Sequence, residues 1–144
     1  MIELESDPQI MKWTPSRVPQ TFEQTLQRLE GQIEKQKDLE PYGFWLADTI
    51  GDGSLIGWFM LRPVDNSKVE FELGFMIVQK KWNQGFAFEI GSALVDFAKT
   101  KNEITKLLAK TDLDNLASQR VLKKLGFQLV QTSDQTFVYF EFPV

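Results

Sequence analysis

The sequence predicts a mixed α/β fold in which helices flank a single sheet. Apolar residues recur at helical spacing in three segments, and short β-branched or aromatic runs bounded by turn residues separate them. The resulting order is helix, three strands, helix, strand, helix and two strands, which is typical of helices packed on a sheet. The chain has 144 residues without a linker or repeat, so we expect one domain spanning residues 1–144.

The first long helix is predicted at residues 21–37. Its apolar positions fall at helical spacing and are Phe22, Leu26, Leu29 and Ile33. Thr21 followed by Gln24 matches the capping-box pattern of a helix start. The preceding residues 7–19 contain three prolines, so we expect them to end one short helix and to loop into the next.

Three strands follow, and they are predicted at residues 44–50, 54–62 and 68–78. A turn at Gly51-Asp52-Gly53 joins the first two strands. In the third strand Glu70 and Glu72 share one side, because side chains alternate along a strand. Gly74 inside this strand indicates either a bulge or the close approach of another group.

The C-terminal half is predicted to alternate helices and strands before a closing hairpin. A helix at residues 85–101 is followed by a strand at 104–110 and a helix at 114–125, which Gly126 ends. The strands of the hairpin are predicted at residues 127–132 and 136–142.

The composition excludes several kinds of site. The chain has no Cys and no His, which excludes thiolate nucleophiles, Cys-ligated metals and a Ser-His-Asp triad. The net charge of −4 argues against a nucleic-acid partner. No apolar run is long enough to span a membrane, and the N-terminus does not resemble a secretory signal. We therefore expect a cytoplasmic protein without a metal, membrane or nucleic-acid partner.

The first candidate binding segment runs from a strand through a short loop into a helix at residues 75–87. A helix N-terminus offers free N–H groups and a partial positive charge, and Gly85 lets a ligand approach the backbone closely. Such a turn suits a diphosphate. Strand–loop–helix turns with one glycine are also common structural features, so this segment alone does not identify a site.

A second candidate segment begins the helix at 114–125. Asn115 and Ser118 are one helical turn apart, so both polar groups can point the same way at the helix start. The alternative interpretation is structural, with Asp114 or Asn115 as the N-cap and Ser118 as a solvated helix residue.

Together the two segments resemble the GNAT superfamily of N-acetyltransferases. The resemblance is to the branch that contains the ribosomal-protein N-terminal acetyltransferases. Its Glu-x-Gly-Tyr-x-Leu and Trp-Gly-x-Gly-Tyr-Ala-x-Glu patterns are similar to residues 72–77 and 82–89. Its Asn-x-x-Ser and Gly-Phe patterns are similar to Asn115, Ser118 and residues 126–127. The implied sheet is mostly antiparallel, with a central parallel pair of strands that splay apart.

The resemblance implies acetyl-CoA as the co-substrate, held by two groups of residues. The pantetheine arm is expected along the backbone of Phe75, Met76 and Ile77, with Asn115 at its end. The diphosphate is expected on the following loop, at Asn83, Gln84, Gly85, Phe86, Ala87 and Phe88. Lysines and arginines could reach the phosphates, and the candidates are Lys80, Lys81, Arg120, Lys123 and Lys124.

The resemblance also implies direct attack of an amine on the thioester. Glu72 is the expected base, directly or through water, with Glu70 on the same face or bulk water as alternatives. The other interpretation of Glu72 is a cross-strand partner for a lysine on an exposed sheet face. Neither tyrosine matches the position of the usual GNAT acid, so Ser118, the acid proposed in the branch, takes that role.

The acceptor amine is not named by the sequence. A peptide N-terminus and a small-molecule amine are both compatible, and a catalytically silent CoA-binding domain is a third interpretation. Trp13 lies in a loop expected beside the acceptor opening, whereas Trp45, Trp58 and Phe59 are more often core residues.

Two departures from the pattern affect these expectations. Asn83 replaces the usual glycine of the loop, so we expect the loop to sit differently on the diphosphate. The family's first strand is not evident in the sequence, so we expect an open sheet edge near its second strand. An open edge invites pairing with another chain, and a homodimer is therefore expected.

Overall fold

The computed structural model describes residues 1–65, 67–130 and 136–144, and its centre is one six-stranded sheet. The strands lie side by side in the order β1-β2-β3-β4-β6-β5. Their bounds are β1 (Gly43–Asp48), β2 (Leu55–Pro63), β3 (Glu70–Ile77), β4 (Lys106–Asp112), β5 (Gln128–Val130) and β6 (Phe137–Pro143). Among the described strands, β3 and β4 alone pair in parallel, and every other neighbouring pair is antiparallel. The predicted fold class is confirmed.

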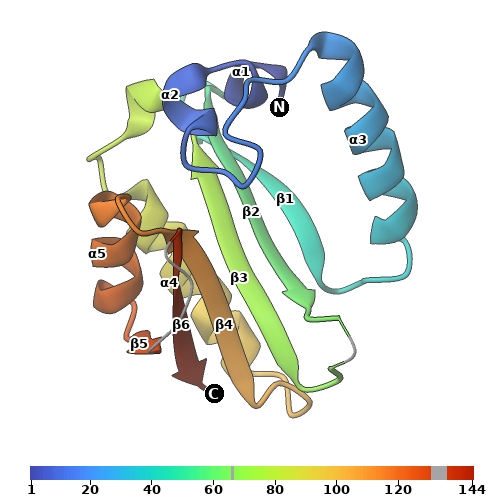
Figure 1. Cartoon of the computed structure of the whole chain (residues 1–144). Helices are drawn as coiled ribbons and strands as arrows, with labels where there is room; N and C mark the ends of the chain where they lie inside the picture. The colour runs from blue at the N-terminus through green and yellow to red at the C-terminus, as the bar shows by residue number, and fades with distance from the viewer. Residues whose placement is uncertain (66, 131–135) are drawn as a thin grey trace.

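Helices cover the sheet unequally. They are α1 (Ile2–Glu5), α2 (Pro8–Met11), α3 (Phe22–Gln36), α4 (Phe86–Lys99), α5 (Leu116–Lys124) and the 3₁₀ turn η1 (Gln79–Lys81). Helix α4 runs behind the sheet, α5 flanks its C-terminal side, and α1 and α2 lie at the end where β3 finishes (Figure 1). The face of the sheet opposite α4 is therefore partly open.

The main core lies between the sheet and α4. Alternate residues of β3 face this layer, and Phe71 and Leu73 are almost fully buried there with Val95 and Ala98 of α4. Apolar contacts of this kind supply most of the driving force for folding. The intervening residues of β3, including the two glutamates, project to the opposite, open face, as the alternation predicts.

Gly74 is explained by a close contact and not by a bulge. The pairing between β2 and β3 runs without a shift in register past Gly74. A Cβ atom at this position would lie 2.6 Å from Cε of Met60, which is closer than atoms pack. Of the two alternatives that the sequence left open, the structure selects the close approach.

Helix α3 starts as the sequence predicts but packs differently from most amphipathic helices. Both hydrogen bonds of the Thr21–Gln24 capping box are present. The helix stands beside the edge strand β1 and not over a face of the sheet (Figure 1). Three of its four apolar positions are consequently exposed, namely Phe22, Leu26 and Ile33. The spacing of these residues predicted the helix, but it did not predict which side is covered.

Strand β1 forms one edge of the sheet, as expected. The Gln36 side chain occupies the start of this edge, because its Oε1 accepts the N–H of Phe44 and its Nε2 donates to the carbonyl of Tyr42. Leu46, further along β1, is 58% exposed. At the other edge, the predicted strand 127–132 is observed only as β5, and residues 131 and 132 lie outside the described part of the chain. None of the helices among the described residues is long and apolar enough to cross a membrane.

Candidate active site

The two parallel strands β3 and β4 separate part-way along their length. They pair at three positions only, and the last of these joins Glu72 to Leu108. Beyond it each strand continues against its outer neighbour, β2 or β6, to Ile77 and Asp112. The inner edges of both strands therefore border a cleft of about 650 Å³. This volume is within the usual range for small-molecule sites.

The N-terminus of α4 forms one wall of the cleft. Gly85 is its N-cap and has φ of +91°, a left-handed conformation that glycine adopts without strain. No side chain of the described residues caps this terminus, and Gly85, Phe86 and Ala87 all line the cleft. The space where a Cβ of Gly85 would lie is open. Free first-turn N–H groups and open space together favour the binding of an anion.

In the loop before α4, Asn83 has a left-handed backbone conformation, which glycine adopts most readily. Its φ is +59°, and asparagine tolerates this left-handed region better than most residues. The indole Nε1 of Trp82 donates to the carbonyl of Ile77, and Nε2 of Gln84 donates to the carbonyl of Lys80. The replacement of glycine by Asn83 therefore leaves the loop in the left-handed conformation that a glycine would also adopt.

A second helix start, that of α5, faces the cleft from the side of β4. Asn115 is the N-cap, and its Oδ1 accepts the N–H of Ser118 at 3.1 Å. Both residues also line the cleft. The structural and functional interpretations of Asn115 are thus compatible, because its Oδ1 caps the helix while its Nδ2 group has no partner among the described residues.

Charge inside the cleft is opposite to that of the whole chain. Among the described residues, four basic ones line it, Lys81, Lys110, Arg120 and Lys124, against a single acidic one, Asp114. The chain as a whole carries a formal charge of −4. A basic cleft in an acidic protein favours an anionic ligand.

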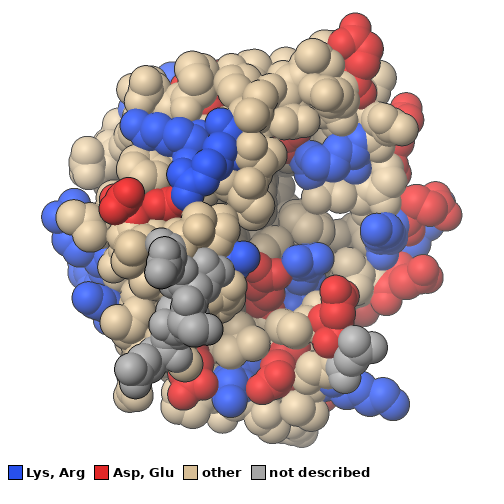
Figure 2. Space-filling model, viewed as in Figure 1, with Lys and Arg blue, Asp and Glu red and all other residues tan. Residues whose placement is uncertain are grey.

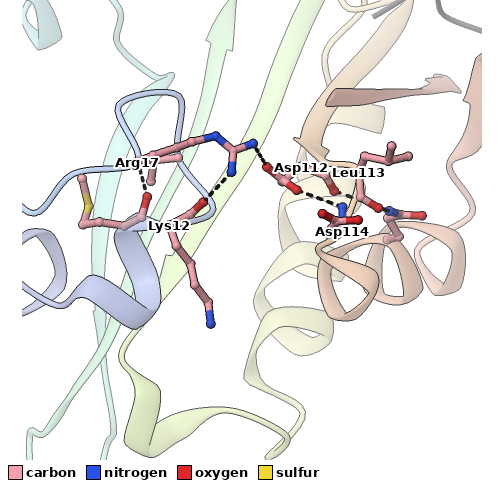
Figure 3. A network of polar contacts seen from close by, with 8 residues as sticks. Lys12, Arg17, Asp112, Leu113 and Asp114 are labelled. Carbon is pink, nitrogen blue, oxygen red and sulfur yellow. Dashed lines mark hydrogen bonds and ion pairs between the residues drawn. The ribbon is translucent and has the colours of Figure 1, made fainter. Parts of the chain in front are cut away.

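The loop after α2 closes the cleft on the side of the N-terminus. Trp13 and Thr14 of this loop line the cleft there, together with Ile10 of α2. The expected place of Trp13 beside the acceptor opening stays a prediction. The guanidinium of Arg17, in the same loop, forms an ion pair with the carboxylate of Asp112 at the end of β4. Figure 3 shows this side chain pointing from the loop toward Asp112. Arg17 has a left-handed backbone with φ of +54°.

Most of the predicted cofactor-binding residues meet in this cleft. Those that line it are Phe75, Met76, Ile77, Asn83, Gly85, Phe86, Ala87, Phe88 and Asn115. Gln84 does not line it, because its side chain turns back to Lys80. Lys80 and Lys123 also lie outside the lining.

The two predicted catalytic residues lie in different places. Ser118 lines the cleft, whereas Glu72 does not and lies at the last paired position below it. Oε2 of Glu72 accepts hydrogen bonds from Nη2 and Nε of Arg62, at 2.7 and 3.2 Å. Arg62 is directly opposite on β2, so Glu72 does form a cross-strand ion pair on the open face, with an arginine where the alternative interpretation expected a lysine. Oε1 of Glu72 is not used by this pair.

Some lining residues were not predicted from the sequence. Ala109, Lys110 and Thr111 belong to β4, which was recognised only as a strand. Because β3 and β4 separate, the C-terminal half of β4 borders the cleft. The splayed strand pair implied by the family resemblance is the signal that could have identified these residues.

Trp45, Trp58 and Phe59 belong to apolar clusters and not to the cleft lining, as expected for core residues. In the part of the chain that the structure describes, neither Tyr42 nor Tyr139 lines the cleft.

Comparison with known proteins agrees with this geometry. The sequence model of the acetyltransferase (GNAT) domain matches residues 1–128 of the chain. FsC-acetyl coenzyme A-N(2)-transacetylase of Aspergillus fumigatus is 27% identical over 138 residues, covering 91% of this chain. The uncharacterized N-acetyltransferase YjdG of Bacillus subtilis is 31% identical over 99 residues, covering 67% of it. The chain spans 58% of the length of each of these relatives.

Solved structures show the same fold at low sequence identity. A GNAT-family acetyltransferase from Bacillus anthracis superimposes with a TM-score of 0.83 at 20% identity, covering 99% of this chain and 86% of the other. RimL, a ribosomal L7/L12 α-N-protein acetyltransferase in complex with coenzyme A, gives 0.82 at 14% identity, covering 99% and 85%. Spermidine N-acetyltransferase from Vibrio cholerae, in complex with CoA and spermine, gives 0.76 at 14% identity, covering 99% and 86%.

Proposed function

Because the chain belongs to the acetyltransferase (GNAT) domain family, we propose that it is an acetyl-CoA-dependent N-acetyltransferase acting on a primary amine. The observation that carries the proposal is the separation of β3 from β4. It leaves two inner strand edges beside a basic cleft that also contains the uncapped start of α4. This combination suits a ligand with an extended amide arm and a diphosphate.

The cleft residues fit acetyl-CoA in two parts. The backbone of Phe75, Met76 and Ile77 would pair with the pantetheine amides, and Asn115 would hold their end. The first-turn N–H groups of α4 and the left-handed loop at Asn83 would receive the diphosphate. When bound, acetyl-CoA supplies an activated acetyl thioester.

In the proposed transfer, the neutral amine attacks the thioester carbonyl carbon. A carbon–nitrogen bond forms, the carbon–sulfur bond breaks, one proton leaves the amine nitrogen and one is delivered to the thiolate. A backbone N–H near Ile77 would polarise the carbonyl. This route needs neither a Cys nor a His, and the chain has neither.

Glu72 is the proposed base and Ser118 the proposed acid. Glu72 lies where β3 and β4 part, on the open face, so its Oε1, which the pair with Arg62 leaves unused, would accept the amine proton through water. Glu70, which points to the same face, or bulk water is the alternative base. Ser118 lines the cleft and would protonate the departing thiolate.

The acceptor is proposed to be a peptide or protein N-terminus that reaches the open face near Trp13. Figure 2 shows this face hollowed near its centre, with both acidic and basic side chains around the hollow. An open surface suits a chain end better than a buried amine. A small-molecule amine is the second candidate. It is supported by the similarity to FsC-acetyl coenzyme A-N(2)-transacetylase, which covers 91% of this chain.

An acetyl-transfer screen tests the proposal. The purified protein would be incubated with acetyl-CoA and a panel of short peptides and small amines, and free thiol and acetylated product would be measured. Product with peptides supports the first acceptor class, and product with small amines alone supports the second. CoA binding without product from any amine would contradict the proposed activity and favour a silent CoA-binding domain.

A homodimer through the β1 edge and a cytoplasmic location complete the proposal. The dimer is supported by the edge position of β1 and the exposure of Leu46. Light scattering at increasing protein concentration tests it, and a strictly monomeric particle would exclude it.

A further inference from the structure

We infer that the ion pair between Arg17 and Asp112 is a positioning element that joins the two walls of the cleft and sets their separation for the cofactor. The inference rests on the proposed function for the identity of the ligand. It adds two residues that do not line the cleft themselves.

The wall on the N-terminal side is tied to Arg17. Nη1 of Arg17 donates to the carbonyl of Lys12 at 3.3 Å, and its backbone N–H donates to the carbonyl of Thr14 at 3.1 Å. Trp13 lies between these two contacts and Thr14 makes the second of them, and both residues line the cleft. A shift of Arg17 would therefore shift this wall.

The opposite wall is tied to Asp112. Its Oδ1 accepts the N–H of Asp114 at 2.9 Å, and its carbonyl accepts the N–H of Asn115 at 3.0 Å. These bonds shape the turn that presents Asn115 to the cleft. The second oxygen, Oδ2, is the one that Arg17 binds (Figure 3).

The ion pair is well suited to fix the distance between the two walls of the cleft. The side chain of Asp112 is 2% exposed, and a buried carboxylate needs a charged partner or several hydrogen bonds. Among the polar contacts of the described residues, this pair alone joins residues 12–20 to residues 109–124. A cleft whose width is fixed in advance binds its ligand with less ordering on binding.

Arg28 and Glu5 provide a matched control. They also form an arginine ion pair with a carboxylate that is 5% exposed, but they join α3 to α1, and neither lines the cleft. The test compares the parent with Arg17→Ala, Asp112→Asn, the double variant and Arg28→Ala. Asp112→Asn removes the charge that binds Arg17 but keeps an oxygen that can accept the N–H of Asp114. Arg17→Lys keeps the charge but loses the forked geometry.

Two readouts are measured on each folded protein. The first is amide hydrogen exchange in residues 113–116, which does not depend on any ligand. The second is the Kd for CoA by titration calorimetry. We expect Arg17→Ala and Asp112→Asn each to accelerate exchange and to raise the Kd about tenfold, with no further effect in the double variant. Arg17→Lys should lie between, and Arg28→Ala should resemble the parent in both.

Unchanged exchange in Arg17→Ala, additive effects in the double variant, or equal effects in Arg28→Ala would overturn the inference. Faster exchange with an unchanged Kd would also overturn it, because the pair would then not position the cofactor site. If the parent itself fails to bind CoA, the proposed function fails, and exchange in residues 113–116 still decides whether the ion pair joins the two walls.

Discussion

The two halves of the β3–β4 pair differ in the hydrogen-bond partners of their backbone groups. The lower half is residues 70–72 with 106–108, and the upper half is the separated remainder of each strand. Below, Glu70 and Glu72 lie in register with Lys106 and Leu108, and the strands bond to each other. Above, each strand keeps only its outer neighbour, so the inner N–H and C=O groups face the cleft. Unpaired backbone groups in a partly buried place need a partner. The lower half of the pair is thus structural, because its strands bond to each other, and the upper half is a binding half, because its inner edges border the cleft.

The contrast also separates two kinds of chemistry. On β3 the upper half contributes backbone groups and small or apolar side chains to the cleft, whereas the lower half carries carboxylates held in ion pairs on the open face. If the proposed mechanism is right, the base belongs to the structural half and the cofactor to the binding half. Variants on each side should therefore change different observables.

The largest expected effect comes from Glu72→Gln. The amide keeps an oxygen for Arg62 but removes the base, so kcat should fall by roughly 10²–10⁴ while acetyl-CoA affinity stays the same. Part of the loss should return at higher pH, where more of the amine is already neutral. Steady-state kinetics with the acceptor found in the screen measures this. Glu70→Gln is the control, and a parent-like rate for Glu72→Gln at neutral pH would assign the role to Glu70 or bulk water.

Gly85→Glu should abolish cofactor binding in the upper half. Saturating acetyl-CoA at about 100 times its Kd should stabilise the parent by roughly 2.7 kcal/mol, which appears as a rise in Tm. The variant places bulk and negative charge at the start of α4, so this rise should vanish. Gly53→Glu is the matched control, since Gly53 also has a positive φ and open surroundings but lies in the β1–β2 turn. A normal rise in Gly85→Glu would contradict the diphosphate assignment.

Alkaline pH should lower the free energy of unfolding, because it ionises Tyr42, which packs against the lower half of β3. Tyr42 packs on Phe71 of β3, and burial, together with the hydrogen bond it donates to Glu103, raises its pKa from 10.0 to about 12. Because the folded pKa is above the unfolded value, this contribution is complete below about pH 10 and is lost as the pH rises toward 12. This rise in the pKa corresponds to on the order of 2–3 kcal/mol of the free energy of unfolding.

The measurement is the free energy of unfolding of the parent and Tyr42→Phe across this range. The difference between the two proteins should shrink with rising pH. A difference that stays constant from pH about 9 to about 12 would show that Tyr42 does not titrate with folding.

Ser118→Ala should give the smallest effect. A thiolate leaves readily and water can protonate it, so the loss in kcat should stay below the roughly 10²-fold lower limit for a positioned acid or base. The loss should vary with the pKa of the thiol in the acyl donor, whereas the Glu72→Gln loss should vary with that of the amine. A Ser118→Ala loss larger than that of Glu72→Gln would reverse the proposed order of the two roles.

Sequence patterns predicted elements better than the surroundings of side chains. The Thr21–Gln24 capping box marked the start of α3, and both of its hydrogen bonds are present. The same helix exposes Phe22 and Ile33, because spacing defines a helix but not the face that a neighbour will cover. Strand ends were shifted by one or two residues, as for β4, predicted at 104–110 and observed at Lys106–Asp112.

The cleft was predictable where a local motif encodes it and not where two distant segments meet. Gly85 and Asn115 each start a helix, so their neighbours in sequence define their role. Lys110 enters the cleft only because β4 leaves β3, which no local pattern signals. The ion pair of Arg17 with Asp112 joins residues 95 positions apart, and it depends on the folded arrangement of both loops.

The Gln36 amide has a consequence for the behaviour of the protein during storage. It binds the outward N–H of Phe44 and the carbonyl of Tyr42, as a neighbouring strand would, and Gly43 leaves room for it because it has no side chain. Exposed strand edges are templates for fibrillar aggregation. The Gln36 side chain thus blocks the start of the β1 edge, so that the part open to pairing with another chain is limited to the few residues around Leu46.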